Sequence, residues 1–253
     1  MNDRARASAV SDPHLSEKAL AAPPLLELVD VRAAYGGIEV LHGVHLAVPE
    51  GAVMALLGPN GAGKSTALKV CGAQIEPTAG EVRVAGRVVN GVSPDELARL
   101  GVCTIPEGRG VFPNLTVREN LWLATQAGVS LDHMEQVAYE RFPRLGERRK
   151  QLAGTMSGGE QQMLAMARAL ATDPALLLLD ELSMGLAPIV VAELYEIVAQ
   201  VSQAGVSIMV VEQFARTVLG IANYAAILVQ GNISRVGTPA ELEEELSAAY
   251  LGE

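Results

Sequence analysis

A glycine-rich loop between an apolar segment and a helical pattern constrains the fold of this chain more than any other feature. The loop occupies residues 58–66, follows the apolar run 53–57 and precedes a segment of helical character that starts at Ala67. Glycines at such a bend let backbone N–H groups point inward around an anion, and the helix N-terminus adds partial positive charge. Strand, loop and helix around the pattern G-x-x-x-x-G-K-[ST] therefore predict a site for the phosphates of a nucleoside triphosphate.

Individual residues of this phosphate loop have predicted tasks. Lys64 is long enough to reach the terminal phosphates, and the Ser65 hydroxyl is suited to ligate a magnesium ion. The alternative is a glycine-rich turn that contains a lysine by chance. We assign nucleotide binding to the whole loop, which consists of Gly58, Pro59, Asn60, Gly61, Ala62, Gly63, Lys64, Ser65 and Thr66.

The composition narrows the class of partner. The 253 residues suffice for one α/β domain with a small additional part and a sizeable core. Nineteen basic against 29 acidic residues give a formal charge of −10, which argues against nucleic acid, because phosphate contacts require a basic surface. Cys71 and Cys103 lie in apolar segments without metal-binding spacing, which is typical of reduced, buried thiols in a cytoplasmic protein.

No segment of the sequence is a candidate for crossing a membrane. The apolar runs have the length of buried strands and fall short of the ~18–20 residues that a spanning helix needs. Residues 1–24 lack the apolar centre of a secretory signal, so we expect a disordered leader followed by one domain over 25–253. If the protein works at a membrane, another subunit must bring it there.

Apolar runs alternate with helical patterns along the chain. Strands predicted at 25–31 and 40–48, with a hairpin over 81–89, indicate an antiparallel β portion. Later runs separated by helical stretches indicate a largely parallel sheet with helices on its faces. These runs lie at 102–105, 176–179, 206–211 and 225–229.

Helix starts are marked by a hydroxyl residue followed three positions later by glutamate. This capping pattern occurs at Ser93, Thr116 and Thr238. From Thr116 the pattern stays helical and charged, so we interpret residues 116–153 as a helical subdomain inserted in the α/β domain.

An acid pair ends one of the predicted strands. The apolar run 176–179 leads into Asp180 and Glu181, which places both carboxylates at the C-terminal edge of the sheet, where ligands of open α/β sheets bind. Asp180 is predicted to hold the magnesium ion, directly or through water, and Glu181 to polarise the water that attacks the γ-phosphate. The alternative is two solvated acids at a strand end.

A third motif, Ser157-Gly158-Gly159-Glu160, precedes a helical segment. Ser157 and Glu160 form a capping box on their own, so these residues could merely start a helix. Two glycines inside a cap weaken a helix, however, and they have a purpose if a phosphate must approach the backbone. We call residues 157–160 the signature segment.

The three motifs together resemble the ATP-binding subunit of ABC transporters, over about residues 26–253. The resemblance implies an α/β P-loop ATPase domain with a RecA-like parallel core, an antiparallel β portion and an inserted helical subdomain. It also implies that the signature segment closes over the ATP of an opposite subunit, so that two such domains enclose two ATP molecules. Tyr35 matches the aromatic residue that stacks on adenine, the alternative being a structural tyrosine at a turn.

The chain departs from the general pattern of that family at several positions. Glu107 stands where most members have glutamine, and the resemblance assigns it to the metal with Ser65 and Asp180. Gln213 replaces a histidine and, with Lys64 and Glu181, is assigned to catalysis. Its amide can hydrogen-bond a γ-phosphate but cannot carry a proton near neutral pH.

Two further departures follow the acid pair. Alanine stands at Ala187, where the family usually has aspartate, and Leu182 stands where proline is usual. Because proline would fix the backbone beside Glu181, we expect its loss to loosen the turn that carries the catalytic carboxylate.

The departures are similar to those of one ATPase subunit of branched-chain amino acid importers. Urea and short-chain amide importers share much of the pattern and remain an alternative. The resemblance implies ATP hydrolysis coupled to import, with Mg²⁺, two membrane-spanning permease subunits and, indirectly, an extracytoplasmic solute-binding protein. It favours a heterodimer of two different ATPase subunits over a homodimer, bound peripherally at the cytoplasmic face of the membrane.

Other readings have less support in the sequence. A soluble, non-transport ATPase of the same family usually fuses two such domains or carries a long coiled coil, and this chain has neither. A P-loop kinase leaves the signature segment and Glu181 without a task. Within 108–113, Phe112 is the predicted apolar contact with a membrane subunit, the alternative being a side chain folded back on its own domain.

Overall fold

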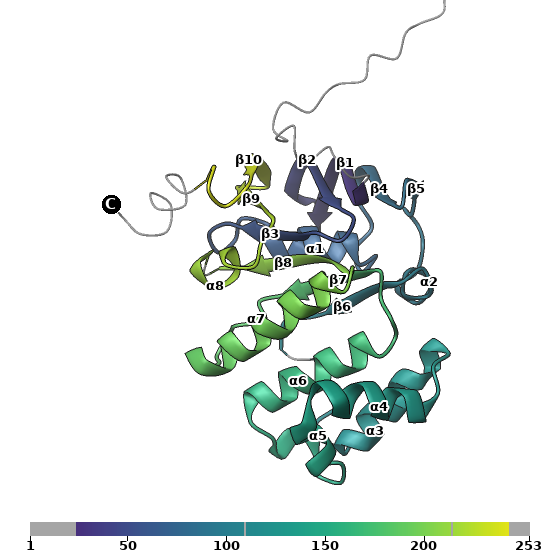
Figure 1. The fold of residues 1–253 in the computed structure, drawn as a ribbon. Coiled ribbons are helices and arrows are strands. Elements are labelled where there is room, and N and C mark those ends of the chain that lie inside the picture. The colour runs from purple at the N-terminus through teal and green to yellow at the C-terminus, as the bar shows by residue number, and fades with distance from the viewer. Residues whose placement is uncertain (1–23, 109, 214, 243–253) are drawn as a thin grey trace, which may run out of the picture.

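The computed structural model describes residues 24–108, 110–213 and 215–242, which form two sheets flanked by helices (Figure 1). The predicted leader, 1–24, lies outside these residues except for Pro24, which opens the first strand. Within the described ranges no helix is both long and apolar enough to cross a bilayer.

The first sheet is antiparallel, as predicted, with the strand order β2-β1-β4-β5. Its tight turn at Gly36 and Gly37 has positive φ angles of 55° and 86°, which glycine adopts without steric cost. The two strands that flank this turn are longer than predicted, because their pairing continues to the turn. The strands of this sheet are β1 (Pro24–Tyr35), β2 (Ile38–Pro49), β4 (Ala79–Val84) and β5 (Arg87–Val88).

The second sheet has the order β10-β9-β3-β8-β7-β6, and its five neighbouring strands from β9 to β6 run parallel, as predicted. Every residue of β3, β7 and β8 is buried, which explains their continuous apolar sequences. The strands are β3 (Val53–Leu57), β6 (Val102–Ile105), β7 (Leu176–Asp180), β8 (Ser207–Glu212), β9 (Tyr224–Val229) and β10 (Asn232–Gly237).

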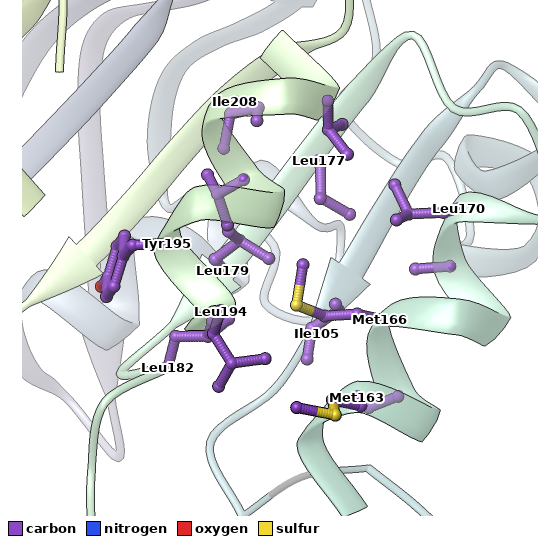
Figure 2. Packing of buried hydrophobic residues seen from close by; sticks show 14 of the residues in the cluster. Ile105, Met163, Met166, Leu170, Leu177, Leu179, Leu182, Leu194, Tyr195 and Ile208 are labelled. Carbon is purple, nitrogen blue, oxygen red and sulfur yellow. The ribbon is translucent and has the colours of Figure 1, made fainter. Parts of the chain in front are cut away.

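Helices cover the parallel sheet and fill two apolar clusters. One cluster joins the two sheets through α1, and the other joins the parallel sheet to α6 (Gly158–Leu170) and α7. Figure 2 shows the second cluster, where Met163 and Met166 of α6 meet residues of the sheet and of α7. The helices of the α/β part are α1 (Lys64–Cys71), α2 (Pro94–Arg99), α7 (Pro188–Gln203) and α8 (Ala215–Leu219).

The remaining helices gather at the end of the molecule opposite the antiparallel sheet (Figure 1). The α-helices within the predicted subdomain 116–153 pack on α6, which follows that range in the sequence. Leu121, Met134 and Leu145 are fully buried in this part. The elements are α3 (Val117–Ala124), η2 (Thr125–Ala127), α4 (Leu131–Arg141), α5 (Pro143–Glu147), η3 (Ala153–Thr155) and α6 (Gly158–Leu170).

The predicted caps are formed where the structure describes them. Ser93 and Thr116 each make a complete capping box, with Glu96 and Glu119 respectively. Thr238 exchanges hydrogen bonds with Glu241, and residues 239–242 form a turn; the rest of the helix predicted there lies outside the described residues.

Cys71 and Cys103 are both free thiols. Burial raises the pKa of Cys71 to about 12, and burial also raises the pKa of Cys103. Since thiolates are the reactive form, both side chains behave as small apolar residues at neutral pH.

Candidate active site

The phosphate loop connects β3 to α1 at the edge of the parallel sheet. Gly63 is the N-cap of α1, with a positive φ of 104° and no side-chain cap, so the first amides of the helix point into the loop. A Cβ atom at Gly58 would lie 2.2 Å from the Leu228 carbonyl oxygen on β9. These two glycines are therefore required by the backbone geometry.

Lys64 lies inside the loop with only 5% of its surface exposed. Its Nζ donates hydrogen bonds to the carbonyl oxygens of Gly58, at 2.9 Å, and Pro59, at 3.1 Å. Burial lowers the pKa of the Lys64 ammonium, while Glu181, Asp180 and other carboxylates nearby oppose the shift. The loop thus holds a positive charge where terminal phosphates would bind.

Ser65 and Asp180 meet across the junction of α1 and β7. The Ser65 hydroxyl donates to Asp180 Oδ1 at 3.2 Å, and Asp180 is only 3% exposed. Burial raises the pKa of Asp180; the Ser65 hydrogen bond opposes this, and the charge of Glu107 adds to it. A hydroxyl and a carboxylate are the oxygen donors that Mg²⁺ prefers.

Glu107 lies in the exposed loop after β6 and faces the same cavity as Ser65. Among the residues that the structure describes, no cluster of three His, Cys, Asp or Glu side chains is arranged to hold a metal.

Glu181 follows Asp180 with a positive φ of 47°, a left-handed conformation that is unusual for glutamate. Its backbone N–H donates to the Val211 carbonyl oxygen at 2.9 Å, which ties the turn to β8. Burial raises the pKa of the Glu181 carboxyl; Lys64 opposes this, and the charges of Glu107 and other carboxylates add to it. A raised pKa makes the carboxylate a stronger base.

One cavity of about 440 Å³ brings half of the predicted site residues together. It is lined by Asn60, Gly61 and residues 63–66 of the phosphate loop and by Glu107, Glu181 and Gln213, the last of which directly follows β8. Asp180 does not line it and reaches the site through its hydrogen bond with Ser65. Val40 and Met184 also line it, and their apolar side chains gave no signal in the sequence.

Tyr35 does not line this cavity. It ends β1 at the tight turn, and 45% of its surface is exposed, so the side chain is free to contact a flat ligand.

The signature segment starts α6 and is built as a complete capping box. The Ser157 hydroxyl donates to Glu160 Oε2 at 2.9 Å and accepts the Glu160 N–H at 3.3 Å, while Glu160 pairs with Arg148 at 3.0 Å. Gly159 also has an internal reason, because a Cβ atom there would lie 2.3 Å from Cγ1 of Val190 on α7. None of residues 157–160 lines the cavity of the phosphate loop.

Phe112 is 47% exposed, and the Arg168 guanidinium lies 5.2 Å from the centre of its ring. Asn120, fully buried, accepts the Phe112 N–H at 2.8 Å and donates to its carbonyl at 3.0 Å. One side of the ring thus contacts its own domain while the other is open.

Sequence reasoning missed Glu212, which is 1% exposed at the end of β8. Its carboxylate accepts hydrogen bonds from Ser183 and Tyr195 beside the acid pair. A charged residue at the end of an otherwise apolar buried strand was the available signal.

Comparison with known proteins agrees with this geometry. The ABC transporter family profile matches residues 41–183. The high-affinity branched-chain amino acid transport ATP-binding protein BraG of Pseudomonas aeruginosa is 42% identical over 90% of this chain and 100% of its own length. The high-affinity branched-chain amino acid transport ATP-binding protein BraF of the same organism is 30% identical over 91% of this chain and 98% of its own length.

A solved structure supports the same assignment. The structure of an ATP-binding subunit of an ABC transporter matches with a TM-score of 0.78 and 28% identity, over 89% of this chain and 95% of that one. Fold, site and sequence therefore agree that this chain belongs to the ABC transporter family, as one of its ATP-hydrolysing, ATP-binding proteins.

Proposed function

We propose that this chain is the ATP-hydrolysing subunit that drives an importer of branched-chain amino acids. The observation that carries the proposal is the 42% identity to BraG over the full length of that protein. The cavity supplies the chemistry, because it contains a phosphate loop, a buried lysine and a glutamate with a raised pKa.

Each residue of the site has a role in this proposal. The phosphate loop and Lys64 bind the phosphates of ATP and neutralise charge that develops on them. Ser65 and Asp180, with Glu107 nearby, would hold Mg²⁺, which would offset negative charge on the phosphates. Glu181 accepts a proton from the attacking water, and Gln213 donates a hydrogen bond to the γ-phosphate.

Tyr35 and the signature segment complete the binding of nucleotide. Tyr35 stacks on adenine from the exposed end of β1. Ser157, Gly158, Gly159 and Glu160 face the ATP of an opposite subunit, where they add donors and exclude water.

The proposed assembly contains a second ATPase subunit and two membrane-spanning permeases, with the ATPases at the cytoplasmic face of the membrane. We favour a heterodimer, because Pseudomonas aeruginosa has two branched-chain amino acid transport ATP-binding proteins, BraF and BraG, and both are similar to this chain. Phe112 is the candidate contact with a permease, since its ring is partly open.

The test is to purify a tagged Glu181→Gln chain from cells in mild detergent with ATP and to identify the proteins bound to it. This variant should bind ATP without hydrolysing it, so the closed assembly should accumulate. We expect two permease subunits and a second ATPase. The Lys64→Ala chain, which should lose tight ATP binding, is the control and should not accumulate the closed assembly.

Two results would contradict the proposal. Recovery of ribosomal or DNA-repair proteins without any membrane protein would exclude the transport role. Uptake of urea but not of leucine by vesicles that contain the purified assembly would assign the chain to the amide importers instead.

A further inference from the structure

Glu212 is a buried carboxylate that none of the motifs explains. It is the last residue of β8, directly before Gln213, and only 1% of its surface is exposed. One carboxylate oxygen accepts the Ser183 N–H at 3.0 Å and the Tyr195 hydroxyl at 2.5 Å. The other accepts the Ser183 hydroxyl at 2.9 Å.

Burying a carboxylate is unfavourable unless hydrogen bonds compensate for the water that it loses. All three donors to Glu212 are neutral, and both donors of Ser183 are used. Burial raises the pKa of Tyr195, and the charge of Glu212 adds to the shift, so Tyr195 remains a donor. The cluster is therefore a fully hydrogen-bonded clamp between β8, the turn after β7, and α7.

The clamp lies next to the strained part of the active site. Glu181 is held at a positive φ of 47°, and its N–H is tied to Val211, the residue before Glu212. Two residues later, Ser183 is tied to Glu212 itself. Leu182, between them, is 2% exposed and belongs to the buried cluster drawn in Figure 2.

The conformation of this turn must come from such contacts. Leucine at position 182 leaves φ free, whereas proline would fix it. An unusual backbone conformation persists only where the surroundings determine it, and here consecutive residues of β8 hold both sides of Leu182. Because Gln213 follows Glu212 directly, the same clamp also fixes the start of the loop that carries Gln213.

We propose that Glu212 is a positioning residue for ATP hydrolysis, which holds the turn that carries Glu181 through both hydrogen bonds of Ser183. This inference rests on the proposed role of Glu181 as the base. Glu212 does not touch the phosphates in this proposal; it sets the place of the Glu181 carboxylate in the cavity relative to Lys64. A misplacement of about 1 Å is enough to slow a reaction about a hundredfold.

The experiment compares kcat for ATP hydrolysis and the Kd of a fluorescent ATP analogue in the purified transporter assembly. Glu212→Ala and Ser183→Ala should lower kcat by about tenfold or more while ATP affinity changes little, because the phosphate loop is intact. Glu212→Gln keeps a carbonyl acceptor on the same stem and should recover part of the loss. In a Glu181→Gln chain, adding Ser183→Ala should cause no further loss, because the positioned carboxylate is already absent.

Ser202→Ala is the matched control, since its hydroxyl donates to the Gly51 carbonyl at 3.4 Å, away from the cavity. It should keep the parental kcat.

If Ser183→Ala and Glu212→Ala also keep the parental kcat while Glu181→Gln is inactive, the positioning role is excluded. If the variants lose kcat only to the extent that they lose ATP affinity or thermal stability, the clamp has a structural role alone and the inference is again overturned. Parental hydrolysis by Glu181→Gln would instead overturn the proposed base.

Discussion

At the scale of single residues, the site contains a buried negative charge, that of Asp180, which is unfavourable for the folded chain on its own. Asp180 is 3% exposed, and burial raises the pKa of its carboxyl above the ordinary value. The ionised form therefore destabilises the folded, nucleotide-free protein at neutral pH. This cost falls away as the pH drops and the carboxyl becomes protonated in both the folded and the unfolded chain.

We therefore expect Asp180→Asn to melt at a higher temperature than the parent at pH 7 without nucleotide, while it loses Mg²⁺-dependent ATP hydrolysis. Asparagine keeps the acceptor for the Ser65 hydroxyl but carries no charge. The difference in melting temperature should shrink as the pH falls towards about 4, near the ordinary pKa of aspartate. Thermal unfolding of both chains across a pH series checks this, and a variant less stable than the parent at pH 7 would contradict it.

Residue type and spacing predicted which polar residues would gather at one place. Six residues of the phosphate loop line one cavity together with Glu107, Glu181 and Gln213. Val40 and Glu212 were missed for a physical reason. Val40 reaches the loop only through the pairing of β2, and Glu212 acts through contacts with Ser183 and Tyr195 that are distant in sequence.

At the scale of elements, the patterns predicted strands best where burial is complete. The residues of β3 were predicted to the last position, whereas β10 was missed because it is an edge strand that contains the polar residues Ser234 and Arg235. In the signature segment, the sequence pattern allowed two explanations for the same glycine. Its glycines suggested an approaching phosphate, but Gly159 also lies against Val190 at the contact of α6 with α7.

We expect Gly159→Ala to lower the free energy of unfolding by about 1–3 kcal/mol, because the added methyl group overlaps Val190. Val190→Ala in the same chain should restore most of that loss by removing the contacting methyl groups. Denaturant unfolding measures both. Gly220→Ala is the control, since a Cβ atom there meets nothing within 4 Å. Equal losses for Gly159→Ala with and without Val190→Ala would show that this contact is not the cause.

ATP hydrolysis by the double variant separates the two reasons for Gly159. If only packing requires this glycine, hydrolysis in the assembly returns together with stability. If a phosphate of the opposite ATP also approaches its backbone, stability returns and hydrolysis stays low. We expect the second outcome, because the signature segment is proposed to face the opposite nucleotide.

At the scale of the whole molecule, the phosphate loop and the signature segment, which we propose as the two halves of a nucleotide site, do not meet within one copy. The phosphate loop lines a cavity to which residues 157–160 contribute nothing, and Ser157 heads a different helix. A second subunit placed head to tail would bring the halves together twice. Sequence alone could not decide between a second copy of this chain and a different ATPase, because both present the same motifs.

Mixing two inactive variants of this chain decides between these assemblies. Lys64→Ala damages the phosphate loop, and Ser157→Ala damages the signature segment, which also loses about 1 kcal/mol of helix capping. In a homodimer, random exchange makes half of the dimers mixed, and each mixed dimer has one intact site of two. ATP hydrolysis would then return to about a quarter of the parental rate.

Since we propose a heterodimer, we expect no recovery from mixed copies of this chain. In the complete assembly with its second ATPase, each variant should damage a different site, and the chain that carries both substitutions should be inactive. Recovery of a quarter of the rate by the mixture would instead establish a homodimer.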